Sequence, residues 1–254
     1  MNIDRRKEIL NQIFKSGSAR VADLAVQYSV NEATVRRDLK YLASNYGIRL
    51  TYGGAFVDER KPSFSIWEHP HEMKKRENYE AKQIIAQKAA QLISDGETIA
   101  LNAGTTVELI LEHLDHISRL NLITACVNIA LKAARNPSIT VYIPGGKIRN
   151  SSGVVYGPDT ESFISRFSVD KCFLGIAAID IKRGVTHPVL EEVAINRSLL
   201  RVSEKKFLVA DTSKFDCLSL VKLADIEEFD AMIVDSDFSP VYRNYANANN
   251  VAII

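Results

Sequence analysis

Cysteine is scarce in this sequence of 254 residues, and the few cysteines are dispersed. Cys126, Cys172 and Cys217 form no Cys-x-x-Cys pair and have no histidine nearby at the spacing of metal ligands. This usage argues against a disulfide scaffold and a structural zinc site, and it favours buried, reduced thiols. We therefore expect a protein that uses neither a metal ion nor a cofactor.

Long apolar runs are also missing. No stretch of 18 residues is apolar, and no apolar segment of the kind found in signal peptides follows the charged start of the chain. We expect a cytoplasmic protein with no membrane partner. A dominant charge is missing too, because 32 Lys and Arg residues stand against 31 Asp and Glu residues. The overall charge therefore neither requires nor excludes a nucleic acid as partner.

Charge is, however, unevenly distributed along the chain. The first 60 residues hold ten Lys and Arg residues against seven Asp and Glu residues, and the remainder is slightly acidic. This difference fits a basic N-terminal domain attached to a nearly neutral second domain, although it is too small to establish one. The length and the 46% of hydrophobic residues are sufficient for one large domain or two unequal ones.

Residues 31–42 predict a helix with one apolar face. Val35, Leu39 and Leu42 recur at i, i+4 and i+7, and Asn31 is a suitable N-cap. The other faces carry polar and basic side chains that can meet DNA bases or phosphates. These side chains are Thr34, Arg36, Arg37 and Lys40. Taken alone, the stretch could equally be an ordinary solvated amphipathic helix.

The flanking segments favour the DNA-binding interpretation. Two more helices are predicted at 4–15 and 21–28, and a tight connection joins the second to the basic helix, as in a helix-turn-helix. Residues 48–56, which include Arg49, combine β-branched and aromatic residues with a pair of glycines. This pattern predicts a small two-stranded wing. We therefore predict a winged helix-turn-helix domain over residues 1–57.

The pattern changes after a polar segment over 58–77, which we interpret as a linker. A helix at 81–92 would turn Ile84 and Ile85 inward, and apolar runs then alternate with helical segments. The runs lie at 98–101, 120–127, 139–143, 171–178, 207–210, 231–234 and 251–254. The alternation predicts an α/β domain over 78–254 with a mainly parallel, buried sheet.

One loop in this second part predicts an anion site. Asn102, Gly104, Thr105 and Thr106 follow a predicted strand and open a helix predicted at 107–114. Glycine allows close approach of a ligand, the threonines offer hydroxyl donors, and a helix start offers free N–H groups. A phosphate ester is the most natural ligand. The alternative is a helix cap that happens to contain threonines. The loop is not a Walker motif, because it lacks Gly-Lys-Ser/Thr.

Further polar residues follow later strands, where open α/β sheets bind ligands. They are Thr124, Gly146, Lys147, Asp180 and Lys214. Each residue alone is weak evidence for a ligand site. Their shared placement after strands is what favours an effector site. Adjacent Glu191 and Glu192 could suggest a catalytic pair, but neighbours on a helix point about 100° apart, so a solvated helix face is the preferred interpretation.

In this order the motifs resemble the DeoR family of bacterial transcription regulators over nearly the whole chain. The N-terminal resemblance rests on Thr34-Val35-Arg36-Arg37-Asp38-Leu39 and Gly53-Gly54-Ala55. The second part resembles that family's sensor domain, which is similar in fold to ribose-5-phosphate isomerase. The matching residues there are Lys82, Asn102–Thr106, Thr124, Gly145-Gly146, Gly157, Gly175, Asp180, Gly184 and Asp211–Phe215.

The resemblance implies a regulator, expected to be a repressor, of carbohydrate-metabolism genes. Its expected partners are double-stranded operator DNA, a phosphorylated sugar or sugar derivative, and a second copy of the chain in a dimer or tetramer. The predicted DNA-binding residues are Asn31, Thr34, Arg36, Arg37, Lys40 and Arg49. The predicted effector-binding residues are Asn102, Gly104, Thr105, Thr106, Thr124, Gly146, Lys147, Asp180 and Lys214.

Two other functions compete with this hypothesis. The first is a sugar-phosphate isomerase with an appended DNA-binding domain. Leu174 and Ala177 stand where the isomerases carry acidic residues, which leaves no obvious base for proton abstraction, and we predict no catalytic residue. The second is a nucleoid or scaffolding protein with a vestigial sensor, which the intact phosphate loop disfavours.

Overall fold

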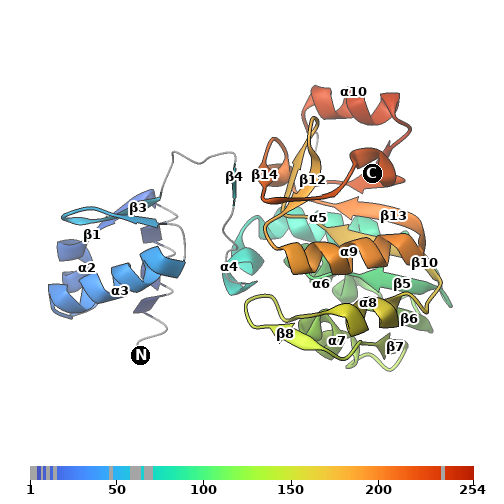
Figure 1. Cartoon of the computed structure of the whole chain (residues 1–254), viewed down its shortest axis with the longest axis horizontal. Helices are drawn as coiled ribbons and strands as arrows, with labels where there is room; N and C mark the ends of the chain where they lie inside the picture. The colour runs from blue at the N-terminus through green and yellow to red at the C-terminus, as the bar shows by residue number, and fades with distance from the viewer. Residues whose placement is uncertain are drawn as a thin grey trace. The chain divides into compact units, whose positions relative to one another are not determined.

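The computed structural model describes residues 5–6, 8–9, 12–13, 16–45, 48–57, 64–65, 71–235 and 238–254. Its contacts divide the chain into two units. The first comprises Met1–Pro62 with Trp67–His69, and the second comprises Ser63–Ile66 with Pro70–Ile254. Figure 1 shows the elements of both units along the chain. In the described part of the chain, no helix combines the length and apolarity needed to span a membrane.

The first unit combines helices with a small antiparallel sheet. Helix α2 (Val21–Gln27) is followed by α3 (Glu32–Asn45). The described residues of the helix predicted at 4–15 are helical. The buried side chains of the first unit include Ile9, Ile13, Leu24, Val35, Leu39 and Leu42. The apolar face predicted for the basic helix is therefore confirmed, and it packs on the unit's small core.

The wing has three strands, whereas two were predicted. Strands β2 (Ile48–Leu50) and β3 (Gly54–Val57) form the expected hairpin, and β1 (Ser18–Arg20) pairs with the other edge of β3. A Cβ on Gly54 would lie 2.2 Å from the carbonyl oxygen of Ala19. Glycine is needed there because it lets β1 approach β3, and that pairing is tertiary information that a three-residue strand does not reveal.

A buried carboxylate ties the start of the chain to α3. Asp38 is 1% exposed, and its Oδ2 accepts hydrogen bonds from Arg5 Nε at 2.9 Å and Nη2 at 2.7 Å. Its Oδ1 accepts from Arg6 Nε at 2.7 Å. Both oxygens are thus occupied by charged donors, which is the arrangement that a buried carboxylate needs. Asp38 therefore supports the scaffold that carries α3.

The second unit is built on a seven-stranded sheet in which every pair is parallel. Its strands are β5 (Thr98–Leu101), β6 (Leu120–Ile123), β7 (Ile139–Tyr142), β10 (Val169–Gly175), β13 (Ser203–Val209), β16 (Ala231–Ile233) and β17 (Ala252–Ile253). Each corresponds to one of the seven predicted apolar runs. The spatial order is β17-β16-β13-β10-β5-β6-β7. The predicted α/β fold with a parallel, buried sheet is confirmed.

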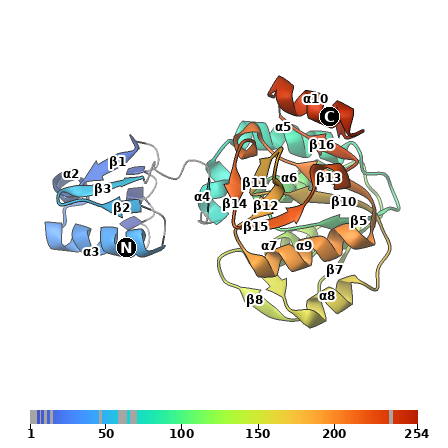
Figure 2. The ribbon, with the colours of Figure 1, turned by 45° about the horizontal axis from the view of Figure 1, so that its top comes forward.

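Helices cover both faces of this sheet (Figure 2). One apolar cluster joins the sheet to α5 (Tyr79–Ala90), α6 (Thr105–Ile110) and α7 (Val127–Ala133). The other joins it to α8 (Pro158–Ile164), α9 (Leu190–Val202) and α10 (Pro240–Ala248). Alternate residues of β10 serve the two clusters, with Phe173 in one and Cys172 and Leu174 in the other. This alternation follows from the two-residue period of a strand.

The face of α5 differs from the prediction. Ile84 is 44% exposed, whereas Lys82 is 3% exposed and Ile85 is fully buried. The helix is rich in alanine, and Ala86, Ala89 and Ala90 are buried with Ile85. A rotation of the helix by one residue therefore leaves the apolar contact intact while it moves Ile84 outward and Lys82 inward.

Short elements surround the carboxyl ends of the strands. Strands β11 (Ala178–Asp180), β12 (Gly184–His187) and β15 (Val221–Ala224) form an antiparallel sheet. Strands β8 (Lys147–Arg149) and β9 (Val154–Tyr156) form a hairpin. The described residues of the predicted linker form β4 (Phe64–Ser65) and α4 (His71–Arg76). Strand β4 pairs in parallel with β14 (Leu218–Ser219) and belongs to the second unit.

Candidate functional sites

The N-terminus of α3 is held by a side-chain cap. Asn31 Oδ1 accepts hydrogen bonds from the backbone N–H of Thr34 and from Thr34 Oγ1, both at 2.8 Å. The cap predicted for Asn31 is therefore confirmed, and it satisfies one of the N–H groups left unpaired at a helix start. The cap also fixes the Thr34 hydroxyl at the exposed end of the helix.

Arg36 links α3 to the tip of the wing. Its Nη1 donates to the backbone carbonyl of Tyr52 at 3.0 Å, and its Nη2 lies 2.9 Å from Glu32 Oε2. Tyr52 itself is 99% exposed. The contacts give Arg36 a role in positioning the wing against α3, which the sequence pattern did not reveal.

Three predicted DNA-binding cations remain on the surface of the first unit. Arg37 and Lys40 are exposed on α3, and Arg49 is exposed on β2. The helix buries Val35, Leu39 and Leu42 on its opposite side. An exposed basic helix face, seated on a core through its apolar side, is the arrangement with which helix-turn-helix proteins enter the major groove.

The second site lies where the order of the parallel strands reverses. From β5 the chain proceeds through β6 and β7 to one edge of the sheet, then returns to β10 and proceeds to the other edge. Ligands of open α/β sheets bind outside the carboxyl ends of the strands at such a switch point. Here Asn102 follows β5 and Gly175 ends β10. Asn102 Nδ2 donates to the Gly175 carbonyl at 2.9 Å, and its Oδ1 accepts from the Gly175 N–H at 2.8 Å.

These bonds hold the two strand ends close together. A Cβ on Gly175 would lie 2.9 Å from Val107 Cγ2, so any other residue would require the Val107 side chain on α6 to shift. Asn102 therefore shapes the loop that presents Thr105 and Thr106, and its amide is engaged by the backbone. Helix α6 itself has six residues, followed by a 3₁₀ turn at Leu111–His113, where one longer helix was predicted. Because α6 is short, an anion bound at this loop would depend more on side-chain contacts than on the helix dipole.

A buried lysine and the predicted phosphate loop converge on one oxygen atom. Lys82 Nζ donates to the backbone carbonyl of Lys74, and Thr105 Oγ1 donates to the same carbonyl at 3.4 Å. Burial, followed by the positive charge of Lys214, lowers the pKa of Lys82. The structure thus brings together Thr105, Lys214 and a lysine that the predicted effector set omits. The signal for Lys82 was present, because it lies one turn before Ile85 and Ala86 on the buried face.

Asp211 completes this group of charges. It is 1% exposed at the end of β13, and its Oδ1 accepts from Asn78 Nδ2 at 2.9 Å and from the Ser213 N–H at 3.1 Å. Its Oδ2 is buried and accepts no hydrogen bond from any residue that the structure describes. A buried carboxylate oxygen without a donor is costly unless a bound group supplies one. This atom suits a hydroxyl or an amine of a ligand.

The other predicted effector residues have local contacts. Thr124 is fully buried, and its hydroxyl accepts from the Cys126 N–H at 3.1 Å. Asp180 Oδ1 accepts from the N–H groups of Lys182 and Arg183, both at 2.9 Å, and thereby shapes the turn between β11 and β12.

The loop after β7 is similar in this respect. A Cβ on Gly146 would lie 2.8 Å from Thr160 Oγ1, and Lys147 is exposed on β8. Among the described residues, no hydrogen bond or ion pair joins Gly146 or Lys147 to Thr105 or Asp211.

The solvated helix face predicted for Glu191 and Glu192 is wrong for Glu192. This carboxylate is 4% exposed, and its Oε1 accepts from Ser152 Oγ at 2.6 Å and lies 3.2 Å from Arg149 Nη1. Its Oε2 lies 3.5 Å from His187 Nε2. The contacts from Arg149 and Ser152 come from a hairpin about 40 residues away in sequence, and they attach the β8–β9 hairpin to the start of α9.

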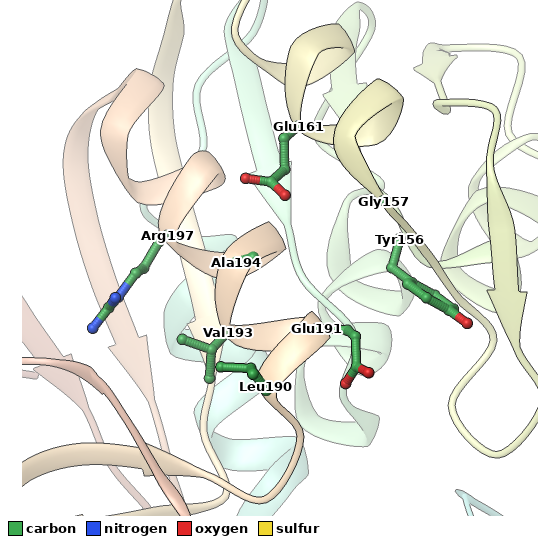
Figure 3. Close-up of a pocket in the computed structure, with 8 residues that line it drawn as sticks. All are labelled: Tyr156, Gly157, Glu161, Leu190, Glu191, Val193, Ala194 and Arg197. Carbon is green, nitrogen blue, oxygen red and sulfur yellow. The ribbon is translucent and has the colours of Figure 1, made fainter.

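A pocket of about 260 Å³ lies beside the start of α9 (Figure 3). Its lining comes from β9, α8 and α9 and includes Tyr156, Glu161 and Leu190. Arg197, which also lines it, donates to the backbone carbonyls of Leu223 at 2.8 Å and Lys222 at 3.0 Å. No predicted effector residue lines this pocket, and we assign it no ligand.

Comparison with protein families gives two matches that together cover most of the chain. Residues 5–61 match the model of the DeoR-like helix-turn-helix domain, and residues 77–236 match that of the DeoR C terminal sensor domain.

Two relatives have similar lengths. The chain is 33% identical to a putative aga operon transcriptional repressor of Escherichia coli O157:H7 over 91% of this chain and 86% of the relative. It is 31% identical to the glycerol-3-phosphate regulon repressor of Escherichia coli K12 over 91% of this chain and 90% of the relative.

Among solved structures, ribose 5-phosphate isomerase A from Methanocaldococcus jannaschii matches 54% of this chain and 55% of its own, with 16% identity and a TM-score of 0.41. A likeness of that size says nothing about ligand or reaction. The family models and the relatives are those of regulators, and the isomerase hypothesis is therefore set aside. The chain belongs to the DeoR family of DNA-binding transcription regulators, and it is not an enzyme.

Proposed function

We propose that this protein is a cytoplasmic repressor of carbohydrate-metabolism genes that responds to a phosphorylated sugar or sugar derivative. Relatives carry names such as glycerol-3-phosphate regulon repressor and lactose phosphotransferase system repressor, the latter from Staphylococcus epidermidis. The observation that carries the proposal is the group of buried polar side chains at the switch point of the sheet. It offers the ammonium of Lys82, the hydroxyl of Thr105 and the Oδ2 of Asp211, which has no donor among the described residues.

These side chains match the two ends of a sugar phosphate. Lys82, Thr105 and Lys214 offer cations and a hydroxyl donor to the phosphate, and charge-assisted hydrogen bonds of this kind are the strongest available. Asp211 accepts from a sugar hydroxyl, which removes the cost of its unpaired oxygen. The ligand-binding role of Asn102, Gly104, Thr106, Thr124, Gly146, Lys147 and Asp180 stays a prediction.

On the DNA side, α3 enters the major groove, with Thr34, Arg37 and Lys40 toward bases or phosphates. Arg36 holds the wing, and Arg49 adds a cation to the wing surface. A single head of this size binds DNA weakly, and operators pair half-sites by two-fold symmetry. The proposal therefore includes a dimer or tetramer.

The DNA interface is tested by Arg37→Ala, with Arg135→Ala as the matched control on an exposed arginine of the second unit. We expect Arg37→Ala to weaken operator binding by about 1–3 kcal/mol in a gel-shift assay at fixed salt, with unchanged thermal stability. Arg135→Ala should bind like the wild type. Equal affinities of both variants would contradict the role of α3.

The effector site is tested by Thr105→Val, which keeps the shape of the side chain and removes its hydroxyl. A ligand found in a sugar-phosphate panel should stabilise the wild type by about 2.7 kcal/mol at 100 times its Kd. We expect Thr105→Val to bind operator normally and to lose most of the ligand's effect on operator release. Normal release by the same ligand would refute the placement of the phosphate at Thr105.

A further inference from the structure

The segment that leads into the second unit is attached to the candidate effector site at three points. Strand β4 pairs with β14, which follows the loop of Asp211. Helix α4 ends against α6, where Lys75 Nζ lies 2.9 Å from Glu108 Oε1. Asn78, in a left-handed conformation with φ of 49°, donates to Asp211 Oδ1 and, at 3.2 Å, to Ser213 Oγ.

The contact at the end of α4 has an unusual chemistry. The Lys74 carbonyl oxygen receives hydrogen bonds from the ammonium of Lys82, a residue that is 3% exposed, and from the hydroxyl of Thr105, a residue that is 7% exposed. Both donors and Lys74 itself belong to the second unit. A backbone carbonyl is a neutral acceptor, whereas a phosphate oxygen carries charge, so it would make the hydrogen bond from Thr105 charge-assisted and the contact with Lys82 an ion pair.

We propose that a phosphate oxygen of the effector replaces the Lys74 carbonyl on Lys82 and Thr105, and that this exchange releases the end of α4. The inference rests on the proposed function, because it takes the effector to be a phosphate ester. It adds Lys82 as a ligand, and it makes the last turn of α4 the element whose position depends on the effector.

The exchange explains why a lysine is buried at this place. Burial and the charge of Lys214 lower the pKa of Lys82, whereas the charge of Asp211 acts in the opposite direction. A dianionic group beside Lys82 and Lys214 would favour both cations and reverse the unfavourable balance. The carbonyl of Lys74 cannot do this, because it carries no net charge.

Loss of that contact changes the start of the second unit, which follows the wing along the chain. Residues 64–76 precede α5 and follow the wing, so a displaced α4 alters the chain that joins the DNA-binding unit to the sensor. A ligand shifts an equilibrium only through different contacts in the two states. The Lys74 carbonyl and the phosphate provide that difference, because both cannot occupy the same two donors.

Hydrogen exchange on the full-length protein tests the proposal, with inorganic phosphate and the best sugar phosphate from the panel as probes. We expect either probe to accelerate exchange in a peptide covering 71–81 by about tenfold or more relative to chloride at equal ionic strength. Lys82→Met should weaken binding of both probes about tenfold or more and should accelerate exchange in 71–81 without any probe. Lys82→Gln serves as a second variant of the same position.

Lys88→Met is the matched control. Lys88 lies on the same helix, is partly buried, and donates to the backbone carbonyl of Val234 at 2.8 Å, away from Thr105. It should bind both probes like the wild type. Probe binding that is abolished by Thr105→Val but unchanged in Lys82→Met would overturn this inference and leave the proposed function standing. Slower exchange of 71–81 with bound probe would also overturn it, and binding of no probe at all would overturn both proposals.

Discussion

Asp38 and Asp211 are equally buried, yet their surroundings differ. Both carboxylates are 1% exposed. Asp38, in the DNA-binding unit, receives charged donors from Arg5 and Arg6 on both oxygens. Asp211, in the sensor unit, receives hydrogen bonds on Oδ1 alone, and its Oδ2 has no donor among the described residues. The comparison separates a charge that holds a scaffold together from a charge that, under the proposed function, accepts a hydrogen bond from a ligand.

This difference has a thermodynamic meaning. A fully paired buried charge stabilises the fold only as a pair, and removal of one partner leaves an uncompensated group. A buried polar atom without a partner costs stability in the free protein and recovers it on binding. Mutation of the first should therefore affect folding, and mutation of the second should affect ligand affinity.

The largest effect is expected for Asp38→Ala. Loss of the carboxylate leaves Arg5 and Arg6 without their acceptor beside the core, and we expect the first unit to lose about 3 kcal/mol of its free energy of unfolding. Native-state hydrogen exchange of α3, compared with that of β5 in the same molecule, measures this loss. Unchanged protection of α3 would show that the ion pairs contribute nothing to the scaffold.

Glu192→Ala sharpens the comparison within the sensor unit. Glu192 is buried and paired with Arg149 and Ser152, so it resembles Asp38 although it shares a unit with Asp211. We expect a loss of about 2 kcal/mol in urea unfolding of the second unit, because the side chain of Arg149 is 29% exposed and can recover some hydration. If Glu192→Ala were neutral, the difference between Asp38 and Asp211 would reflect the unit and not the pairing.

The smallest effect on stability is expected for Asp211→Asn. The amide keeps an acceptor for Asn78 and removes a buried charge, so the free energy of unfolding should change by less than about 1 kcal/mol. Effector affinity should nevertheless fall by about 1.5–3 kcal/mol, because a hydrogen bond to a charged group is lost. Calorimetry with the panel's best ligand measures both quantities. A large loss of stability with unchanged affinity would show that Asp211, like Asp38, supports the fold and not ligand binding.

Much of the fold could be predicted from the sequence, because its signals are local. The seven strands coincide with apolar runs, and α3 coincides with an apolar spacing of i, i+4 and i+7 beside a good N-cap. Strand β1 could not be predicted, since its three residues carry no pattern and its pairing depends on Gly54.

The candidate sites were less predictable, because their contacts join distant parts of the chain. Glu192 is paired with Arg149, 43 residues away, and Asp211 with Asn78, 133 residues away. An alanine-rich helix such as α5 leaves its inward face ambiguous, so Ile84 was predicted inside in place of Lys82. The strand-end loops could be located from the sequence, but the atoms they bring together could not.

The position of β10 beside β5 also sets an order of assembly during synthesis. The centre of the sheet cannot form until residue 175 has emerged from the ribosome, whereas the strands described in the DNA-binding unit end by residue 57. At about 5–20 residues per second, the interval between these two points lasts about 6–24 s. During that time a nascent chain carries the helices and strands described in the DNA-binding unit without the centre of the sheet on which its sensor is built.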